Sequence, residues 1–440
     1  MPVSLFSSPV YADLFADEEL CRLLCDDSDV AHMIVFERTL AIVQGRLGVI
    51  PAIAAGEIEE KLAHAQVDPA RLAAGTQAAG IPVPALLTEL RELVGKDAGD
   101  WLHWGATSQD VMDTAMMLQA KVVFGILSAR LTKLIDTLQR QSTRYADVLM
   151  AGRTRSQVST PITLGYRIAQ WAHPLIDAEA ALPELRHNAL KVQFGGASGT
   201  NNAIYPEGPA VSKALSQELG LADSPSWHVN RTPLLKISSW LVQLTAALSK
   251  MAQDLTLLGR SDIGEVTSGA GGGSSTMPQK SNPVQAETIQ VIHQMSITAE
   301  HGLLIAANPA EERDGAKWPL EWHCLPQLFL CTGRSLQHAQ ALAESLTPRP
   351  DGLSGTIDAN PAIMAEAASF ALAKAGVSRV AAKEIVAAAS TDTLPFNEAL
   401  SSRSPVEINW SEILDPSSAI RPTQEMANQI FSRRQHRSAD

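Results

Sequence analysis

The feature that most constrains the fold is a helical run over residues 108–149. It contains no proline and only one glycine, Gly125. Apolar residues recur close to the three-to-four spacing of a helix, at Val111, Ala115, Val122, Ile126, Leu131, Leu134 and Leu138. At 1.5 Å per residue such a helix would be roughly 60 Å long. Because that exceeds one ordinary domain, we expect its apolar stripe to pack against other long helices.

Three further helical runs cover about residues 234–258, 284–307 and 325–346. Strand signals are sparse and short, so the sequence predicts an all-α fold with an elongated central bundle of long helices. Smaller helical domains flank the bundle, because proline and glycine break the first hundred residues into short helices. The expected domains are residues 1–105, 106–346 and 347–440, and the last ends in a polar, frayed tail.

Composition and charge limit the kinds of molecule that this protein can bind. The 47 acidic and 35 basic residues leave a formal net charge of −12, which disfavours a nucleic-acid binder. An acidic protein binds an anion only where a few cations gather in one cleft. The N-terminus lacks a secretory signal, and no run approaches the roughly 18 to 20 apolar residues of a membrane helix. We therefore expect a cytoplasmic protein that binds no membrane.

The four cysteines predict no metal centre. Cys21, Cys25, Cys324 and Cys331 form no CxxC pair, and no histidine is placed to complete a zinc site. We expect four buried thiols in a reducing compartment, and no metal or other cofactor.

The most informative segment, residues 267–287, reads TSGAGGGSSTMPQKSNPVQAE and lies between two long helices. Four of the five residues 269–273 are glycine, which predicts a flexible loop that can close over a ligand. The loop presents Ser274, Ser275, Lys280 and Asn282 beside two prolines. A plain linker is the alternative. A phosphate-binding loop is excluded, because no Gly-Lys-[Ser/Thr] ends the glycine run.

Two further segments carry polar side chains at the ends of the longest helix. Residues 101–114 (WLHWGATSQDVMDT) place Thr107 and Ser108 where that helix begins, at the positive end of its dipole, which suits a substrate carboxylate. His103 in the same segment is open to core packing or to a place in the site. Residues 150–165 (MAGRTRSQVSTPITLG) end the helix and hold Arg153 and Arg155 as a donor cluster. Simple helix capping and a solvated loop are the alternatives.

Two other segments lie near the ends of neighbouring helices. Residues 308–322 (NPAEERDGAKWPLEW) hold Arg313 among acids, where a surface ion-pair face is the alternative. Residues 193–202 (QFGGASGTNN) either bring backbone donors to a ligand or form a turn. Helix ends about 40 to 60 Å apart cannot meet within one chain. We therefore predict a homotetramer in which helix ends from different subunits converge in shared sites.

The stretch from Gly273 to Pro283, GSSTMPQKSNP, resembles the signature GSSxMPxKxNP of the fumarase/aspartase superfamily. The resemblance extends over nearly the whole chain, through TSQD, GRT and IMAEAASFALA at 363–373. Within the superfamily, WLHWGATSQDVMDTA and EERDGAKWPLEW are most similar to bacterial 3-carboxy-cis,cis-muconate cycloisomerases. The resemblance implies an all-helical homotetramer with each site built from three subunits. It also implies Ser274 as the proton-transfer residue, with carboxylate ligands at Lys280, Asn282, Thr107 and Ser108.

One position departs from a related branch of the superfamily. Adenylosuccinate lyases carry a histidine in a GRTH motif that protonates the leaving group, and Arg155 stands there in this chain. An arginine does not donate a proton near neutral pH, because its pKa is above about 12. Opening a lactone expels a carboxylate, which leaves unprotonated, and Arg155 can hold it by paired hydrogen bonds. The departure therefore favours a cycloisomerase over an enzyme that eliminates an amine.

We therefore predict a reaction on a small polycarboxylate, 3-carboxy-cis,cis-muconate, in aromatic (protocatechuate) catabolism. A carboxylate oxygen adds across a double bond to give a γ-lactone, while Ser274 delivers a proton to the carbon beside another carboxylate. The cations would be Arg153, Arg155, Lys280 and Arg313. The alternatives are an adenylosuccinate-type lyase that releases fumarate, with His103 as its candidate acid, and a non-catalytic helical scaffold.

Overall fold

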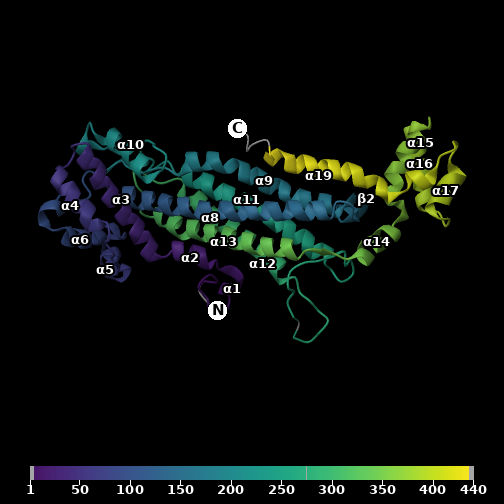
Figure 1. Ribbon diagram of the computed structural model, residues 1–440, viewed down its shortest axis with the longest axis horizontal. Coiled ribbons are helices and arrows are strands. Elements are labelled where there is room, and N and C mark those ends of the chain that lie inside the picture. Colours follow the sequence, from purple (N-terminus) through teal and green to yellow (C-terminus); the bar gives the residue numbers. More distant parts are fainter. Residues whose placement is uncertain (1–3, 274, 436–440) are drawn as a thin grey trace. The chain divides into compact units, whose positions relative to one another are not determined.

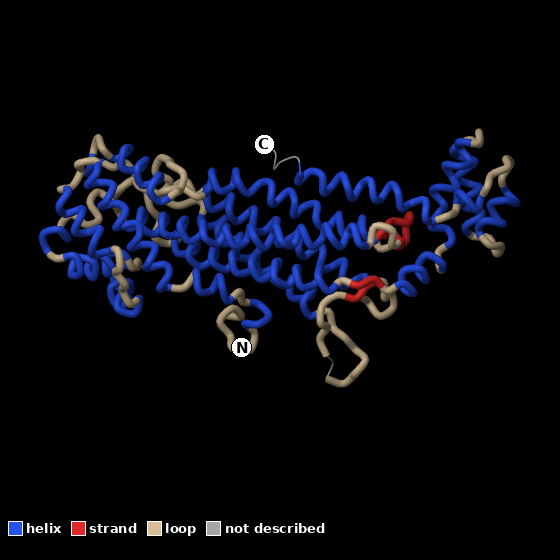
Figure 2. The backbone as a smooth tube through the Cα atoms, viewed as in Figure 1, coloured by secondary structure: helices blue, strands red, loops and turns tan. Residues whose placement is uncertain are grey.

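The computed structural model describes residues 4–273 and 275–435, so the catalytic candidate Ser274 lies outside the described residues. These residues form nineteen α-helices, three short 3-10 helices and four short strands (Figure 1). The strands form two antiparallel pairs (Figure 2). The predicted all-α class is confirmed.

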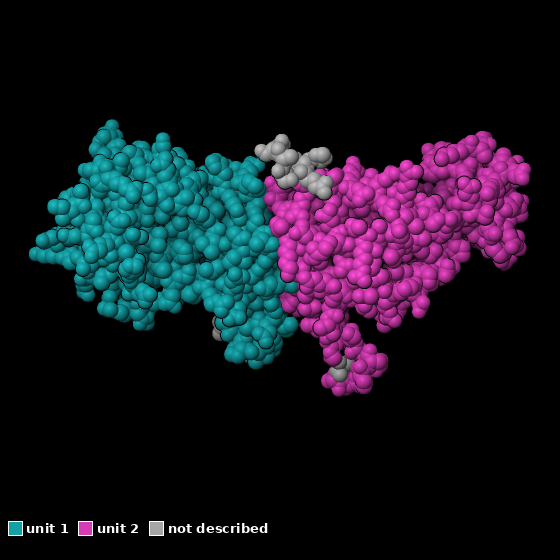
Figure 3. Space-filling view, in the orientation of Figure 1, with its two compact units in different colours: residues 1–130, 181–246, 291–337 teal, residues 131–180, 247–290, 338–440 magenta. Residues whose placement is uncertain are grey.

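The chain folds into two compact units (Figure 3). Unit 1 comprises residues 1–130, 181–246 and 291–337, and unit 2 comprises residues 131–180, 247–290 and 338–440. The three-domain division at residues 105 and 346 stays a prediction. Five long helices contribute residues to both units: α8 (Ser108–Arg144), α9 (Leu164–Ala189), α11 (Thr232–Leu258), α12 (Val284–Ala306) and α13 (Trp318–Ser345).

Unit 1 holds the helices of the first hundred residues and a short helical insert after α9. Most are short, as predicted, but α3 runs for 21 residues because it has no proline and its only glycine, Gly45, lies next to its last residue. The remaining elements are α1 (Ala12–Phe15), α2 (Glu18–Leu23), α3 (Asp26–Arg46), α4 (Ala52–Leu62), α5 (Pro69–Ala79), α6 (Val83–Val94), α7 (Lys96–Gly99), η1 (Asn202–Ile204) and α10 (Gly208–Leu219).

Unit 2 holds the strands and the C-terminal helices. The small helices pack around a separate apolar core that includes Leu372, Leu400 and Trp410. The elements are β1 (Leu149–Thr154), β2 (Gln157–Thr163), β3 (Val266–Thr267), β4 (Thr347–Pro348), α14 (Pro350–Asp358), η2 (Pro361–Met364), α15 (Ala365–Lys374), α16 (Arg379–Ser390), α17 (Phe396–Arg403), α18 (Trp410–Ile413), η3 (Pro416–Ala419) and α19 (Ile420–Gln435).

The longest predicted helix is shorter than its proline-free run. Helix α8 ends at Arg144, and residues 150–165 do not end it as expected but belong largely to the antiparallel hairpin of β1 and β2. Two causes are visible in β2. Val158, Thr160 and Ile162 are β-branched, which favours a strand, and Pro161 disfavours continuation of the helix.

The buried stripe of α8 also differs in part from the prediction. Val122 is 43% exposed and Ile126 is only partly buried, whereas Val123, Phe124 and Leu127 are fully buried.

By length and composition α8 is apolar enough to cross a membrane, with a mean hydropathy of 1.3 over an 18-residue window. However, 67% of that window is buried, and the core helix of a folded protein shows the same property.

The four thiols are all free, but they are not all buried. Cys324 and Cys331 lie in the core, whereas Cys21 is partly exposed and Cys25 is exposed. The expectation of four buried thiols is therefore wrong for the first pair, because both sit on the short α2 and the turn after it rather than on a packed helix face.

Candidate active site

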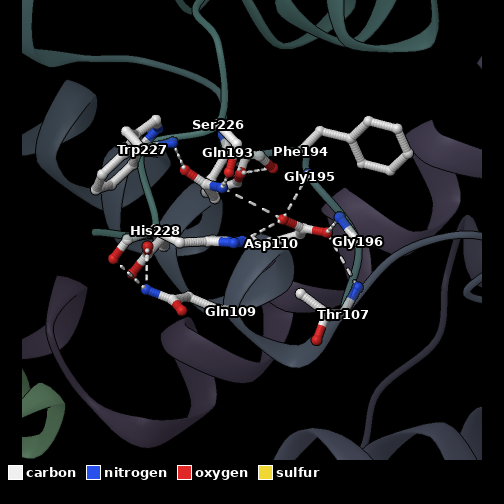
Figure 4. A network of polar contacts seen from close by, with 12 residues as sticks. Thr107, Gln109, Asp110, Gln193, Phe194, Gly195, Gly196, Ser226, Trp227 and His228 are labelled. Carbon is white, nitrogen blue, oxygen red and sulfur yellow. Dashed lines mark hydrogen bonds and ion pairs between the residues drawn. The ribbon is translucent and has the colours of Figure 1, made fainter. Parts of the chain in front are cut away.

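The start of α8 is organised around one buried carboxylate, that of Asp110 (Figure 4). Asp110 lies in the first turn and reaches back to the backbone N–H of Thr107 at 3.0 Å, as the acidic residue of a capping box does. The N–H groups of Gly195 and Gly196 donate to its two oxygens at 2.9 Å each. His228 Nε2 approaches Oδ1 at 2.8 Å. We call these five residues the α8-start network.

This network changes what the helix start offers to a ligand. The backbone N–H of Thr107, which the sequence places at the helix end that suits a substrate carboxylate, is already bound to Asp110. Ser108 is partly exposed, and its hydroxyl has no hydrogen-bond partner among the described residues. Of the two predicted ligands at this helix start, Ser108 therefore keeps an available side-chain donor.

Two loops are fastened to α8 through Gln193. The Thr114 hydroxyl donates to the carbonyl of Gln193 at 3.1 Å and accepts from its N–H at 2.9 Å. The Gln193 side chain accepts from the Trp227 N–H at 2.8 Å and donates to Ser226 Oγ at 2.9 Å. Residues 193–202, for which the sequence left a turn or a donor loop open, thus carry the Gly195 and Gly196 donors of the network.

A second buried charge group lies one turn further along α8. Arg231 is 2% exposed and makes paired hydrogen bonds to Asp113 at 2.7 and 3.0 Å and to Glu321 at 2.8 and 2.5 Å. Its guanidinium also lies 4.6 Å from the centre of the Trp227 ring. Burial raises the pKa of Glu321 to about 7, and Asp113 adds to the rise while Arg231 opposes it. Arg231 is therefore already saturated by two carboxylates.

His103 is bound to a buried acid on α3. Its Nδ1 lies 2.6 Å from Glu37 Oε1, and the Glu37 side chain is fully buried. Burial alone would lower the pKa of His103, but the charge and hydrogen bond of Glu37 outweigh it, so the pKa is raised. The backbone of His103 has a left-handed φ of 63°, which is uncommon for this residue type and concentrates at functional sites.

Arg313 lies beside the α8-start network without an acidic partner. Its Nε donates to Gln109 Oε1 at 3.0 Å and its Nη2 to the carbonyl of Ala197 at 3.2 Å. Gln109 in turn donates to the carbonyl of His228 at 3.1 Å. Within the described part of the chain no carboxylate forms an ion pair with Arg313, so the alternative of a surface ion-pair face is not formed there. Its charge is available to an anionic ligand.

The two predicted hairpin arginines have different surroundings in unit 2. Arg153 on β1 makes paired hydrogen bonds to the buried Glu265 at 2.8 and 2.6 Å, so its charge is already neutralised. Arg155 is exposed at the turn between the strands, and it shares the turn with Ser156 at φ values of 50° and 65°. Positive φ at both central residues is the geometry of a type I′ turn, which usually takes Asn or Gly.

The signature loop, which the structure describes at residues 268–273 and 275–283, leads from β3 to α12 (Figure 2). It is anchored to α13 where Ser268 Oγ donates to the carbonyl of Leu342 at 2.9 Å. It closes on itself where Gly272 and Asn282 exchange two backbone hydrogen bonds of 2.8 Å. Lys280 is exposed and Asn282 is partly buried.

The structure thus places the predicted residues in two groups. Unit 1 brings His103, Thr107, Ser108 and Arg313 around the start of α8, and unit 2 carries Arg153, Arg155, Lys280 and Asn282. Sequence reasoning missed the buried polar partners Glu37, Asp110, Gln193, His228 and Arg231. One local signal pointed to two of them, since His228 and Arg231 are polar residues crowded just before a long helix. Among the described residues no group of three or more His, Cys, Asp or Glu side chains is placed to hold a metal ion.

The sequence matches a protein-family profile described as lyase over residues 7–296. A 3-carboxy-cis,cis-muconate cycloisomerase from Bradyrhizobium diazoefficiens is 36% identical, over 83% of this chain and 83% of its own. Another, from Pseudomonas aeruginosa, is 37% identical over 82% of this chain and 80% of its own. The chain therefore belongs to this lyase family, the fumarase/aspartase superfamily.

Two solved structures share the whole fold. A fumarate lyase from Mesorhizobium sp. superposes with a TM-score of 0.88 at 29% identity, covering 95% of this chain and 98% of that chain. The β-carboxy-cis,cis-muconate cycloisomerase from Acinetobacter calcoaceticus superposes with a TM-score of 0.87 at 27% identity, covering 96% and 100%. The helical fold predicted from the sequence is thus the fold of this superfamily.

Proposed function

We propose that this chain converts 3-carboxy-cis,cis-muconate into a carboxymuconolactone. One carboxylate oxygen forms a bond to a carbon of the double bond, and the π electrons move to the carbon beside another carboxylate. That carbon then takes a proton. The similarity to cycloisomerases over most of the chain supports this choice of substrate.

The observation that carries the proposal is Arg155. It occupies the position where an amine-eliminating relative would need a proton donor. Its guanidinium is exposed and has no carboxylate partner among the described residues, whereas the neighbouring Arg153 is neutralised by Glu265. A strained turn that presents a free arginine suits a group that holds a carboxylate by paired hydrogen bonds. The carboxylate that adds to the double bond, or leaves it in reverse, is such a ligand.

The other predicted residues take roles that fit the charge of the intermediate. Ser274 delivers the proton to carbon, and the enolate-like species before protonation carries extra negative charge. Lys280 and Asn282 on the signature loop, with Ser108 and Arg313 in unit 1, supply donors and cations for it. Thr107 and His103 lie near Ser108 in unit 1, and the raised pKa of His103 keeps its ring charged over a wider pH range.

A helix of 37 residues such as α8 keeps its two ends roughly 55 Å apart, so one site combines residues from both ends only if subunits share it, and the proposal includes a homotetramer. An exposed apolar strip on α12 supports it. Val291 and Ile305 are 43% and 48% exposed, and Ile297 and Leu304 are 49% and 55% exposed. The two members of each pair are a whole number of heptads apart in sequence, so they lie on the same side of the helix. Apolar side chains exposed over several turns mark a surface that a partner covers.

The test offers the purified chain 3-carboxy-cis,cis-muconate and adenylosuccinate in separate assays. Loss of the diene absorbance with the first substrate only is the expected result. Release of fumarate from adenylosuccinate would instead support the amine lyase. If neither substrate reacted, the result would support the non-catalytic helical scaffold. We expect light scattering to give the molar mass of four chains, and a monodisperse monomer would contradict the shared site.

A further inference from the structure

His228 is a buried histidine with one ring nitrogen left open. Its side chain is 3% exposed, and Nε2 is held by Asp110 at 2.8 Å. Because Asp110 also accepts three backbone N–H groups, its oxygens act as acceptors and the ring proton lies on Nε2. Nδ1 is then an acceptor in the neutral ring, and it is buried with no hydrogen-bond partner among the described residues. A buried polar atom without a hydrogen-bond partner indicates a place where a ligand can bind.

The chain around Nδ1 leaves that nitrogen approachable. Gly199 passes beside it with a φ of 82°, and a Cβ built there would lie 3.6 Å from Nδ1 and 3.2 Å from Ser226 Oγ. Any larger side chain at this position would fill the space next to the ring. The small residues of the 193–202 loop therefore keep the open face of His228 clear.

An available cation, Arg313, lines a small cavity together with His228. A cavity of 10 Å³, about the space of one water molecule, is lined by His228, Gln109 and Arg313 among others. Among the residues that the structure describes, Arg313 donates to two neutral oxygens, the Gln109 amide and the Ala197 carbonyl. A carboxylate is a stronger acceptor than either, so it can displace them and widen the cavity.

Several charged side chains surround the His228 ring. They come from α8, from the segment of His228 itself, from the chain between α12 and α13, and from α13: Asp110, Asp113, Arg231, Arg313, Asp314 and Glu321. Arg231 is neutralised by two of these acids, so Arg313 is the unpaired cation of the set within the described residues. A ligand carboxylate bound beside Arg313 would neutralise this cation.

We propose that His228 and Arg313 form a carboxylate subsite, and that Nδ1 takes up a proton from solvent when the carboxylate binds. The bound state is then Asp110 carboxylate, imidazolium and ligand carboxylate in line, with the guanidinium beside the ligand. The subsite rests on the proposed function, since it holds one carboxylate of the proposed tricarboxylate substrate. The lactone carries one carboxylate fewer than the substrate, so each turnover consumes a proton that the enzyme must obtain from solvent.

The experiment measures binding and proton uptake together. Tricarballylate, an unreactive tricarboxylate, is titrated calorimetrically into the full-length protein at about pH 8 in two buffers of different ionisation enthalpy, where free imidazole side chains are largely neutral. The wild-type protein is expected to take up about one proton per site. His228→Gln keeps a donor toward Asp110 but has no second nitrogen, so affinity should fall about ten- to a hundredfold and the uptake should vanish.

Two variants separate binding from structure. His228→Asn offers a polar group near the Nδ1 position but cannot reach Asp110, and it replaces the first variant if that one does not fold; it too should lose the proton uptake. His64→Gln, an exposed histidine after α4, should change neither quantity. Unchanged affinity and uptake in folded His228→Gln would overturn the subsite, and so would wild-type binding without proton uptake.

The outcomes also separate this inference from the proposed function. Tricarballylate binding with uptake that depends on His228, in a protein that leaves 3-carboxy-cis,cis-muconate unchanged, supports the subsite and contradicts the proposed reaction. Conversion of 3-carboxy-cis,cis-muconate with the same KM and kcat in wild type and His228→Gln supports the reaction and overturns the subsite.

Discussion

The α8-start network and the signature loop hold their polar groups in opposite ways. In the network the Asp110 carboxylate is completely buried, and its partners Gly195 and His228 lie 85 and 118 residues away in sequence. In the loop Ser275 and Lys280 are exposed, and the backbone pair of Gly272 with Asn282 closes the segment locally.

The difference separates two ways of building a site. Buried donors and acceptors must all be satisfied at once, so packing determines where each points and the network is a part of the fold. An exposed loop contributes little to the core, so its residues are free to serve chemistry alone. The predictions below test whether substitutions at the α8-start network mainly lower stability and substitutions in the signature loop mainly lower turnover.

The largest effect is expected in the loop. Ser274→Ala should lower kcat by about 10²- to 10⁴-fold, the usual contribution of a group that transfers a proton. The circular dichroism and the thermal midpoint should stay unchanged, because the neighbouring loop residues are exposed. Steady-state kinetics on 3-carboxy-cis,cis-muconate measures the loss. Ser275→Ala is the matched control, and equal losses in the two variants would remove the special role of Ser274.

The next effect is expected in the buried charges beside the network. Arg231→Met leaves Asp113 and Glu321 buried without their cation, which should cost about 3–5 kcal/mol of stability. Denaturant unfolding followed by circular dichroism measures it. The exposed pair of Arg260 and Asp262 is the control, because solvent screens it and Arg260→Met should leave stability nearly unchanged. Similar costs in both variants would mean that the buried acids find other partners.

A smaller effect concerns the pH dependence of binding. Glu37 raises the pKa of His103 against the effect of burial, so removing that acid in Glu37→Gln should lower the pKa. A histidine with a raised pKa contributes its stabilising charge fully at low pH and loses it as pH rises through the folded-state value. We expect KM to increase with pH as His103 loses its charge. In Glu37→Gln this increase should begin at lower pH, and KM near neutrality should be about tenfold higher than in the wild type.

The pH profile of KM is the deciding measurement for this pair. Glu37→Asp keeps a negative charge and should restore part of the shift. A profile that is identical in wild type and Glu37→Gln would show that His103 does not contact the substrate as a cation.

The smallest effect is expected from a glycine of the loop. Gly273 has open space around the position of a Cβ and an ordinary φ, so Gly273→Ala should change the free energy of unfolding by less than about 0.5 kcal/mol. A buried comparison is Gly165, where a Cβ would lie 2.5 Å from the carbonyl oxygen of Ser142, and alanine there should destabilise clearly. If Gly273→Ala destabilised as much, the loop would be part of the packed fold.

Much of the fold could be predicted because helical periodicity is a local property. The runs at 234–258 and 284–307 correspond closely to α11 and α12. Helix α9 was missed because Pro174 and Pro183 lie within it, although its apolar face packs well enough to keep it helical. The hairpin of β1 and β2 was missed because its strand signal is short and follows a long helix directly.

The sequence by itself determined the helical class, the family and the loop that carries Ser274, Lys280 and Asn282, because periodicity and a contiguous motif are written in neighbouring residues. Only the tertiary structure decided which charges remain available. Arg153 is neutralised by Glu265, 112 residues away, and the Thr107 N–H is taken by an acid that three distant donors hold in place. Burial forces such groups to pair, and the choice of partner depends on which segments the fold brings together.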